Sequence, residues 1–111
     1  MIKRNILQNK ISNLFMMFKI KISFLSLLVD ITGREEIFLA LKENSTIRDL
    51  LQNLIRKFGK EFENTIFISP NNLSKYVILS LNGKAIHSSE NLDTNLYDGD
   101  EIIFLPAIAG G

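Results

Sequence analysis

The sequence contains no cysteine, no tryptophan, and a single histidine, His87, among its 111 residues. Without cysteine the chain can form no disulfide, no thiolate nucleophile and no cysteine-based metal site. A lone histidine argues against a histidine-dependent triad and against a metal centre, and a solvated loop residue is the simpler interpretation of His87. We therefore expect no metal site and no histidine-dependent catalytic triad.

An excess of charge of one sign is also missing, as is a long hydrophobic run. The chain has 13 basic and 12 acidic residues, for a net charge of +1. A net charge this small does not produce an electrostatic field that would attract nucleic acid or a membrane surface. No apolar run approaches the roughly 20 residues that span a bilayer. A hydrophobic content of 46% is ordinary for a soluble globular protein, and the length allows one domain. We expect a cytoplasmic location, with neither nucleic acid nor membrane as a partner.

Residues 1–17 differ from the rest, because they carry basic residues and no acidic one. A targeting or membrane-surface segment is one interpretation, although the compact apolar core and small-residue cleavage site of a secretory signal are lacking. The simpler expectation is a flexible, dispensable extension, or a start codon placed upstream of the true one at Met16 or Met17.

Two strands are predicted next. Apolar and polar residues alternate over 18–24, the period of a half-buried strand. A second apolar run covers 37–42, and Asp30 to Gly33 looks like a turn between them, with Gly33 able to adopt a positive φ. The short link predicts an antiparallel hairpin.

The clearest helix follows, with Ser45 or Thr46 as its N-cap and Gly59 as a left-handed C-cap. Its apolar residues fall on one stripe: Ile47, Leu50, Leu51, Leu54, Ile55 and Phe58. Residues 60–75 show no regular pattern and are left unassigned, although Ile66, Phe67 and Ile68 could fold back onto the core.

The remainder predicts three more strands. The first is Tyr76 to Leu81, which a short strand over 84–86 follows after the turn Asn82-Gly83, a strong hairpin signal. Leu92 and Leu96 are expected to point inward from an irregular segment, and Asp98-Gly99-Asp100 forms a turn. The last strand, Ile102 to Leu105, is ended by Pro106, which cannot donate to a ladder.

Together these elements predict an α+β fold in which a mixed sheet of about five strands packs on one main helix. The last strand is apolar on both faces, because Ile102 and Phe104 alternate with Ile103 and Leu105. That pattern suits a central strand and leaves apolar surface beside the segment that follows it.

The final residues are Pro106-Ala107-Ile108-Ala109-Gly110-Gly111. At ordinary glycine usage, a final Gly-Gly arises by chance in roughly one chain in 200. A carboxylate is a poor electrophile and reacts only after activation, usually as an acyl-adenylate made with ATP. An activating enzyme must thread the tail through a narrow channel, which side chains would obstruct and glycines would not. The pattern therefore indicates that the Gly111 carboxylate is the reactive group and that Gly110 provides clearance.

Residues 18–111 resemble the small subunit of molybdopterin synthase, within the MoaD/ThiS group of ubiquitin-like sulfur carriers. The stretches that carry the resemblance are Phe24–Gly33 (FLSLLVDITG) followed by Glu35-Glu36, the helix Ser45–Gly59, the hairpin Leu81-Asn82-Gly83 and, most specifically, Leu96–Gly111 (LYDGDEIIFLPAIAGG). The Leu105-Pro106 step favours the molybdopterin branch over the thiazole branch. The family often has Pro-Pro after the strand, so Pro106-Ala107 implies a less stiff tail.

The resemblance implies a β-grasp domain over 18–105 and a flexible tail over 106–111. It also implies that the chain binds no cofactor and is not catalytic on its own. A partner enzyme would adenylate Gly111 with ATP, and the product would become a thiocarboxylate. The sulfur would then pass to the cyclic pyranopterin precursor in the large subunit of molybdopterin synthase, within a hetero-oligomer. The expected partner-binding residues are Leu105, Pro106, Ile108, Ile103 and Glu101, with Asp98 and Asp100 as further candidates for pairing with basic residues of the activating enzyme.

Three alternatives remain open at this point. The chain could be a ubiquitin-like modifier that is conjugated to target lysines through Gly111. It could instead supply sulfur for thiamine synthesis or tRNA thiolation. It could also be a plain β-grasp interaction module, in which Gly110 and Gly111 have no role.

Overall fold

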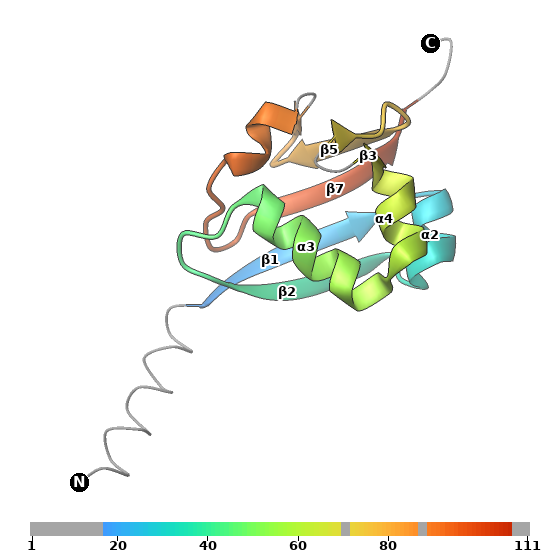
Figure 1. Cartoon of the computed structure of the whole chain (residues 1–111). Coiled ribbons are helices and arrows are strands. Elements are labelled where there is room, and N and C mark those ends of the chain that lie inside the picture. The colour runs from blue at the N-terminus through green and yellow to red at the C-terminus, as the bar shows by residue number, and fades with distance from the viewer. Residues whose placement is uncertain (1–16, 70–71, 87–88, 108–111) are drawn as a thin grey trace, which may run out of the picture.

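The computed structural model describes residues 17–69, 72–86 and 89–107, and within these ranges a five-stranded mixed sheet is covered on one face by helices (Figure 1). The elements are β1 (Met17–Phe24), α2 (Leu27–Thr32), β2 (Glu36–Lys42), α3 (Ile47–Phe58), α4 (Lys60–Ile66), β3 (Phe67–Ser69), β4 (Asn72–Leu73), β5 (Val77–Leu81), β6 (Lys84–Ile86), the 3₁₀ turn η1 (Ser89–Asp93) and β7 (Glu101–Pro106). The predicted α+β class and the mixed sheet on one main helix are confirmed. β1 begins at Met17, one residue before the predicted strand.

The last strand occupies the centre of the sheet, as its apolar faces predicted. The strand order is β2-β1-β7-β5-β6, with β7 parallel to β1 and antiparallel to β5. Ile102 and Phe104 of β7 are fully buried on the helix side. The predicted hairpin of β1 and β2 is confirmed as an antiparallel pair.

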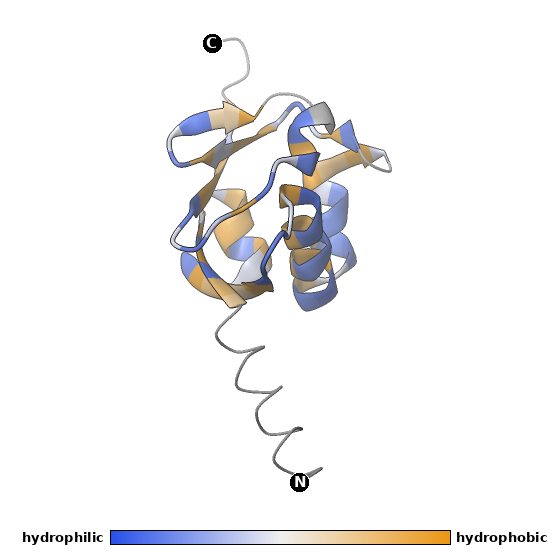
Figure 2. Ribbon diagram, turned by 90° about the vertical axis from the view of Figure 1, so that its left-hand side faces the viewer, coloured by the Kyte–Doolittle hydropathy of each residue, from blue (hydrophilic) through white to orange (hydrophobic). Residues whose placement is uncertain are grey.

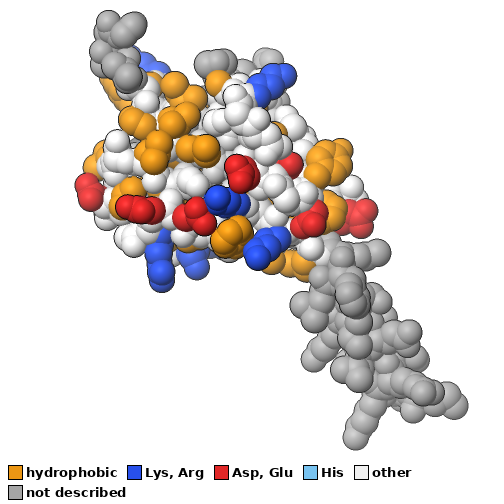
Figure 3. All heavy atoms as spheres, turned by 180° about the vertical axis from the view of Figure 1, so that it is seen from behind, with side chains coloured by type: hydrophobic (Ala, Val, Ile, Leu, Met, Phe, Trp, Pro, Cys, Tyr) orange, Lys and Arg blue, Asp and Glu red, His pale blue; other side chains and the backbone are white. Residues whose placement is uncertain are grey.

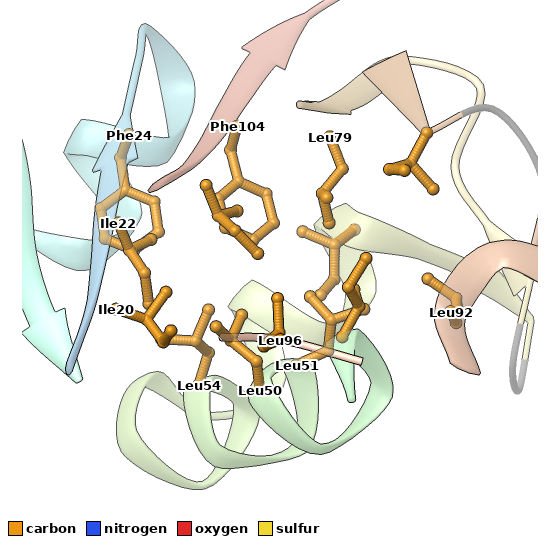
Figure 4. Close-up of a cluster of buried hydrophobic side chains, with 14 of the residues drawn as sticks. Ile20, Ile22, Phe24, Leu50, Leu51, Leu54, Leu79, Leu92, Leu96 and Phe104 are labelled. Carbon is orange, nitrogen blue, oxygen red and sulfur yellow. The ribbon is translucent and has the colours of Figure 1, made fainter. Parts of the chain in front are cut away.

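The core lies between the sheet and the helices. Figure 4 shows Ile20, Ile22 and Phe24 of β1 facing the leucines of α3 across this layer. Each such side chain contributes roughly 1.5–3 kcal/mol on burial. Figure 2 shows that the helices carry both hydrophilic and hydrophobic residues, as expected of elements with one buried side. The inward positions predicted for Leu92 and Leu96 are confirmed.

The helix α3 begins and ends close to its predicted positions. Thr46 is the N-cap, and a reciprocal capping box joins it to Asp49, whose carboxylate accepts from the Thr46 N–H at 2.9 Å. Gly59 has the positive φ expected of a C-cap, but its φ/ψ of 89° and −162° lies outside the left-handed helical region. The prediction fails there because Gly59 must also begin α4, and its carbonyl accepts from the Glu63 N–H at 3.1 Å.

The link between β1 and β2 is a short helix, α2, rather than the tight turn that was predicted. Leu28 of this helix is buried in the core, and Gly33 closes the helix with φ 72° and a hydrogen bond from its N–H to the Val29 carbonyl at 2.7 Å. The positive φ predicted for Gly33 is therefore confirmed. The helix forms because burying Leu28 gives the link a hydrophobic anchor that a turn of polar residues would lack.

Residues 60–75 are more regular than their sequence indicated. Phe62 and Ile66 lie one helical turn apart in α4 and are both fully buried, and β3 and β4 form a small antiparallel pair. Ile66 does fold onto the core and Phe67 is half-buried, but Ile68 is exposed. Pro70 and Asn71 of the predicted turn lie outside the described residues.

The C-terminal hairpin and strand bear directly on the site. Asn82 and Gly83 have φ values of 51° and 86°, which confirms the predicted tight turn between β5 and β6. Pro106 is the last residue of β7 and lies opposite Val77, so the strand includes the proline that was predicted to stop it after Leu105. The proline is tolerated because in this register its nitrogen points away from β5, toward the side where β1 has already ended opposite Phe104.

Candidate functional site at the end of the central strand

The site begins where β7 leaves the sheet. The Ala107 N–H donates to the Tyr76 carbonyl at 2.9 Å, so the pairing with the β5 side continues one residue beyond Pro106. Residues 108–111 come next in the sequence. Three predicted site residues, Ile108, Gly110 and Gly111, lie outside the described residues. The chain is therefore fixed by the sheet up to Ala107.

An aromatic cluster supports this end of β7 from below. Phe104 stacks on Phe24 with ring centroids 5.5 Å apart and meets Phe62 edge-on at 5.8 Å. Phe58 contacts Phe24 and Phe62 at 5.7 Å each. Such pairs contribute about 0.5–1.5 kcal/mol each beyond their buried area. The residues of β7 nearest the tail thus rest on a well-packed, rigid base.

Beside this strand end lies an open groove of about 380 Å³. Its lining residues are Leu25, Leu27, Leu28, Asn64, Thr65, Ser74, Tyr76, Val77, Leu105 and Pro106. None of them carries a charge. Two predicted partner-binding residues, Leu105 and Pro106, therefore share one surface with Leu27 and Tyr76, each of which is 61% exposed.

The face of the sheet opposite the helices provides a second apolar surface. Ile103 and Leu105 are half-buried there and pair with Ser80 and Ile78 of β5. Seen from behind in Figure 3, hydrophobic side chains gather at the upper left of the molecule, and most of the charged side chains in this view lie below them. The sheet thus places Ile103 and Leu105 side by side with the tail exit.

The acidic residues at the other end of β7 have partners within the chain. Glu101 lies 3.8 Å from the Lys21 ammonium, which is also 3.4 Å from Glu36. Asp98 accepts from the Lys19 backbone N–H at 2.8 Å. Leu105 is four positions after Glu101, about 13 Å along a strand, so the structure does not bring Glu101 to the tail exit.

Asp100 connects the two turns at that end of the sheet. Its carboxylate accepts from the Tyr97 N–H at 2.8 Å and from the Asn82 amide at 2.9 Å. The Asn82 side-chain oxygen in turn accepts from the Glu101 N–H at 2.8 Å. These contacts hold the start of β7 in register and give Asp100 a role in the fold.

Sequence reasoning missed Leu25, Leu27 and Tyr76 as neighbours of the tail exit. One signal was available, because the run Phe24 to Leu28 places apolar residues too densely for a solvent-exposed turn. Nothing in the sequence pattern placed Tyr76 opposite Ala107.

Two further observations concern metal binding and membrane-spanning helices. Across the described ranges 17–69, 72–86 and 89–107, no group of three or more His, Cys, Asp or Glu side chains is arranged to hold a metal ion. No helix in the described part of the chain is long and apolar enough to cross a membrane.

Comparison with known families gives one match that covers most of the chain. Residues 22–111 match the model of the ThiS family. A protein of Archaeoglobus fulgidus described as a candidate sulfur carrier is 32% identical over 69 residues, which cover 62% of this chain and 77% of that protein.

Solved structures give the same fold. The solution structure of small archaeal modifier protein 1 from Methanosarcina acetivorans is 29% identical, with a TM-score of 0.69 over 86% of this chain and 98% of that one. A candidate subunit 1 of the molybdopterin converting factor from Pyrococcus furiosus is 21% identical, with a TM-score of 0.66 over 82% of this chain and 99% of that one. The fold is therefore a ubiquitin-like β-grasp, as the resemblance implied.

Proposed function

The chain belongs to the ThiS family, and on that premise we propose that it donates sulfur in molybdopterin synthesis through its own terminal carboxylate. This family comprises small sulfur carriers and ubiquitin-like modifiers. Membership of the family supports the general class of the protein, and the assignment to the molybdopterin pathway is our proposal. The chain itself would supply the acyl group, while partner proteins would supply catalysis.

The chemistry would take place on Gly111 in three stages: activation, thiolation and transfer of the sulfur. A carboxylate oxygen attacks the α-phosphorus of ATP, and pyrophosphate leaves, which forms an acyl-adenylate. A sulfur nucleophile such as hydrosulfide then attacks the acyl carbon and displaces AMP, with loss of a proton, which leaves a thiocarboxylate. In the large subunit, the thiocarboxylate sulfur would attack an electrophilic carbon of the pterin precursor and displace an oxygen leaving group from it, which forms a thioester between Gly111 and the precursor. Water would then cleave the acyl–sulfur bond of this thioester, so that the sulfur stays on the precursor and the Gly111 carboxylate is restored.

The observation that carries the proposal is the anchor at Ala107, directly before the segment that contains Gly110 and Gly111. The Ala107 N–H donates to the Tyr76 carbonyl at 2.9 Å, which holds the chain to the sheet four residues before Gly111. Four residues reach at most about 14 Å, so the Gly111 carboxylate must react within that distance of the anchor. A rigid base followed by a thin end matches what threading into another protein's active site requires, and Gly110 would supply the clearance.

The two expected partners are an activating enzyme that uses ATP and the large subunit of molybdopterin synthase. Both would approach the same end of β7, because the short tail allows no other geometry. Leu105 and Ile103 offer the apolar contact surface there, with Pro106 and Ile108 next to it. Glu101 would contact only a partner that also extends across the charged end of the sheet.

Reconstitution of the sulfur transfer tests this proposal. The full chain, loaded as a thiocarboxylate, is mixed with the purified large subunit and the cyclic pyranopterin precursor, and molybdopterin is measured as its fluorescent oxidation product. We expect product in proportion to the loaded chain. The matched control is a chain that lacks Gly111, which should yield none. A loaded chain that leaves the precursor unchanged would remove the molybdopterin assignment.

Conjugation to other proteins is a second candidate, supported by the 29% identity to an archaeal modifier protein. Here the adenylated Gly111 would react with a lysine amine, with release of AMP and formation of an isopeptide bond. Immunoblots of cells that carry an N-terminally tagged chain would show a ladder of conjugates. The ladder should disappear when Gly111 is deleted, and a ladder that persists would exclude this route.

A further inference from the structure

We propose that the outer edge of β2 (Glu36–Lys42) pairs with the same edge of a second copy of this chain, so that two sheets join across a two-fold axis. β2 is the outermost strand on its side of the sheet (Figure 1), and in the described ranges 17–69, 72–86 and 89–107 only β1 pairs with it. The outer edge of such a strand presents backbone donors and acceptors that another strand can bind. This surface is separated from β7 by β1, so it is distinct from the tail exit.

The outer edge of β2 has few of the features that prevent strand pairing. Proteins protect such edges with prolines, bulges, very short strands or charges along the edge. β2 has seven residues with no proline or glycine, and its register with β1 runs without a bulge. Its charged residues, Glu36 and Lys42, lie only at the two ends. The opposite edge of the sheet, β6, has three residues, so β2 is the edge that can bind a further strand over several residues.

The hydrogen bonds to β1 determine which backbone groups of β2 point outward. The Phe24 N–H donates to the Glu35 carbonyl at 2.8 Å, so these two opposite residues form a hydrogen-bonded pair. Such pairs alternate along an antiparallel ladder, and the odd-numbered residues of β2 therefore also face β1. The Lys42 carbonyl accepts from the Ser45 N–H at 3.1 Å. The residues whose N–H and C=O groups point away from β1 are the even-numbered ones, Glu36, Phe38, Ala40 and Lys42.

The two charges of β2 identify the partner as a second copy. Glu36 lies three positions before Leu39, and Lys42 lies three positions after it. In an antiparallel pairing centred on Leu39, Glu36 of each copy lies opposite the partner's Lys42, on the same face of the joined sheet. Phe38 lies opposite the partner's Ala40, so the outward backbone groups of the two strands meet. One two-fold axis thus satisfies both the charges and the hydrogen bonds.

The same register also pairs the greatest length of strand. Centring on Leu39 pairs all seven residues of β2 with the seven of the partner. Moving the centre by one residue in either direction pairs only 36–40 or 38–42, and it separates Glu36 from the partner's Lys42. The acidic residues directly outside β2 would lie beyond the paired strands, where they are exposed and like charges interact weakly.

Apolar side chains at this edge are incompletely covered within one copy. On the helix side, Leu39 is half-buried, whereas Ile20, opposite it on β1, is fully buried. The two-fold axis brings the two Leu39 side chains together and covers them. On the other face, Phe38 is 55% exposed and would pack on the partner's Ala40. Removal of these side chains from water favours the pairing.

The joined sheet would leave both tails accessible. β7 runs parallel to β1, and β1 runs antiparallel to β2. Because the two β2 strands are antiparallel, the two β7 strands end at opposite ends of the joined sheet. Each copy therefore presents its own tail, and we expect sulfur loading to be the same for variants that pair and variants that do not. The pairing and the proposed function can thus be tested independently.

Sedimentation equilibrium of the full chain between about 10 µM and 1 mM tests the pairing, because a single edge contact is small and its affinity is low. We expect a monomer–dimer equilibrium in this range. Lys42→Glu sets two acidic side chains opposite each other twice, by symmetry, and should weaken dimerisation by about tenfold. Combining it with Glu36→Lys restores opposite charges and should return the affinity to within about threefold of the parent. Lys84→Glu is the matched control, since it makes the same charge change on an exposed residue of β6 and should leave dimerisation within about twofold.

Hydrogen exchange of the parent chain locates the contact. The amide hydrogens of Phe38 and Ala40 should exchange more slowly as the concentration rises, whereas those of Ile37 and Leu39, which already face β1, should change little. Thermal melting confirms that each variant is folded. A parent that stays monomeric up to about 1 mM, or a dimer in which the Phe38 and Ala40 amides gain no protection, overturns the proposal. A loss in Lys42→Glu that the double variant does not restore overturns it as well.

Discussion

Replacing Asp100 with alanine tests whether the acidic turn before β7 serves the fold or a partner. The Asp100 carboxylate accepts two hydrogen bonds, from the Tyr97 N–H at 2.8 Å and from the Asn82 amide at 2.9 Å. Through Asn82 it also fixes the Glu101 N–H at the start of β7. Asp100→Ala removes both acceptors, so the turns on either side lose their common link.

The expected cost follows from these two contacts. A hydrogen bond to a charged group contributes about 1.5–3 kcal/mol, and because Asp100 is only half-buried we take about 1–1.5 kcal/mol for each. Asp100→Ala should therefore lower the free energy of unfolding by about 2–3 kcal/mol. Asp100→Asn keeps one acceptor oxygen and should lose about half as much.

Equilibrium unfolding in urea measures both losses. With an m-value of about 1.3 kcal/mol per M, the midpoint for Asp100→Ala should fall by about 2 M, with the slope unchanged. Sulfur loading by the activating enzyme, measured where all variants are folded, should stay within about twofold of the parent. A stable Asp100→Ala variant that is nevertheless poorly loaded would refute the structural role and assign Asp100 to the partner interface.

Three further predictions concern the scaffold. Thr46→Ala removes the capping box with Asp49 and should lower the free energy of unfolding by about 1–2 kcal/mol in urea titrations, and a loss under 0.3 kcal/mol would show the cap to be unimportant. Ser26→Gly relieves the positive φ of 53° and should raise that free energy by about 1 kcal/mol, so any loss of stability would contradict the strain argument. Phe62→Ala leaves a cavity among Phe24, Phe58 and Phe104 and should lower the free energy of unfolding by about 3–5 kcal/mol in the same titration. A decrease below about 1.5 kcal/mol would mean that the aromatic cluster does not support β7.

Long periodic elements were predictable from the sequence. The helix α3 repeats its apolar residues every three or four positions and carries a cap at Thr46, so its start and end were found. The central position of β7 followed from apolar residues on both faces, which only a strand paired on both sides can accommodate.

The short elements were not predictable, for a physical reason. The helix α2 has six residues and buries only Leu28, so no periodic pattern could reveal it. The helix α4 depends on Phe62 and Ile66 alone among polar neighbours, and it follows directly on Gly59, which looked like the end of a helix rather than the start of another. Both are stabilised by tertiary packing and not by local propensity.

The residues of the candidate site likewise fall into two groups, those that the sequence identified and those that it did not. Leu105 and Pro106 were identified because they precede the glycines in sequence. Leu25, Leu27 and Tyr76 were missed because only sheet pairing brings the ends of β1, β5 and β7 together, and the decisive contact, Ala107 to Tyr76, joins residues 31 positions apart (107 − 76).

The most direct test of the central claim is the intact mass of the chain after incubation with its activating enzyme, ATP and a sulfur source. If the terminal carboxylate is the reactive group, the mass should rise by the difference between one sulfur and one oxygen atom, and fragmentation should place that change on Gly111. A variant without Gly110 and Gly111 should keep its original mass. An unchanged mass for the parent chain with an enzyme that is demonstrably active, or the same gain in the truncated variant, would contradict the account.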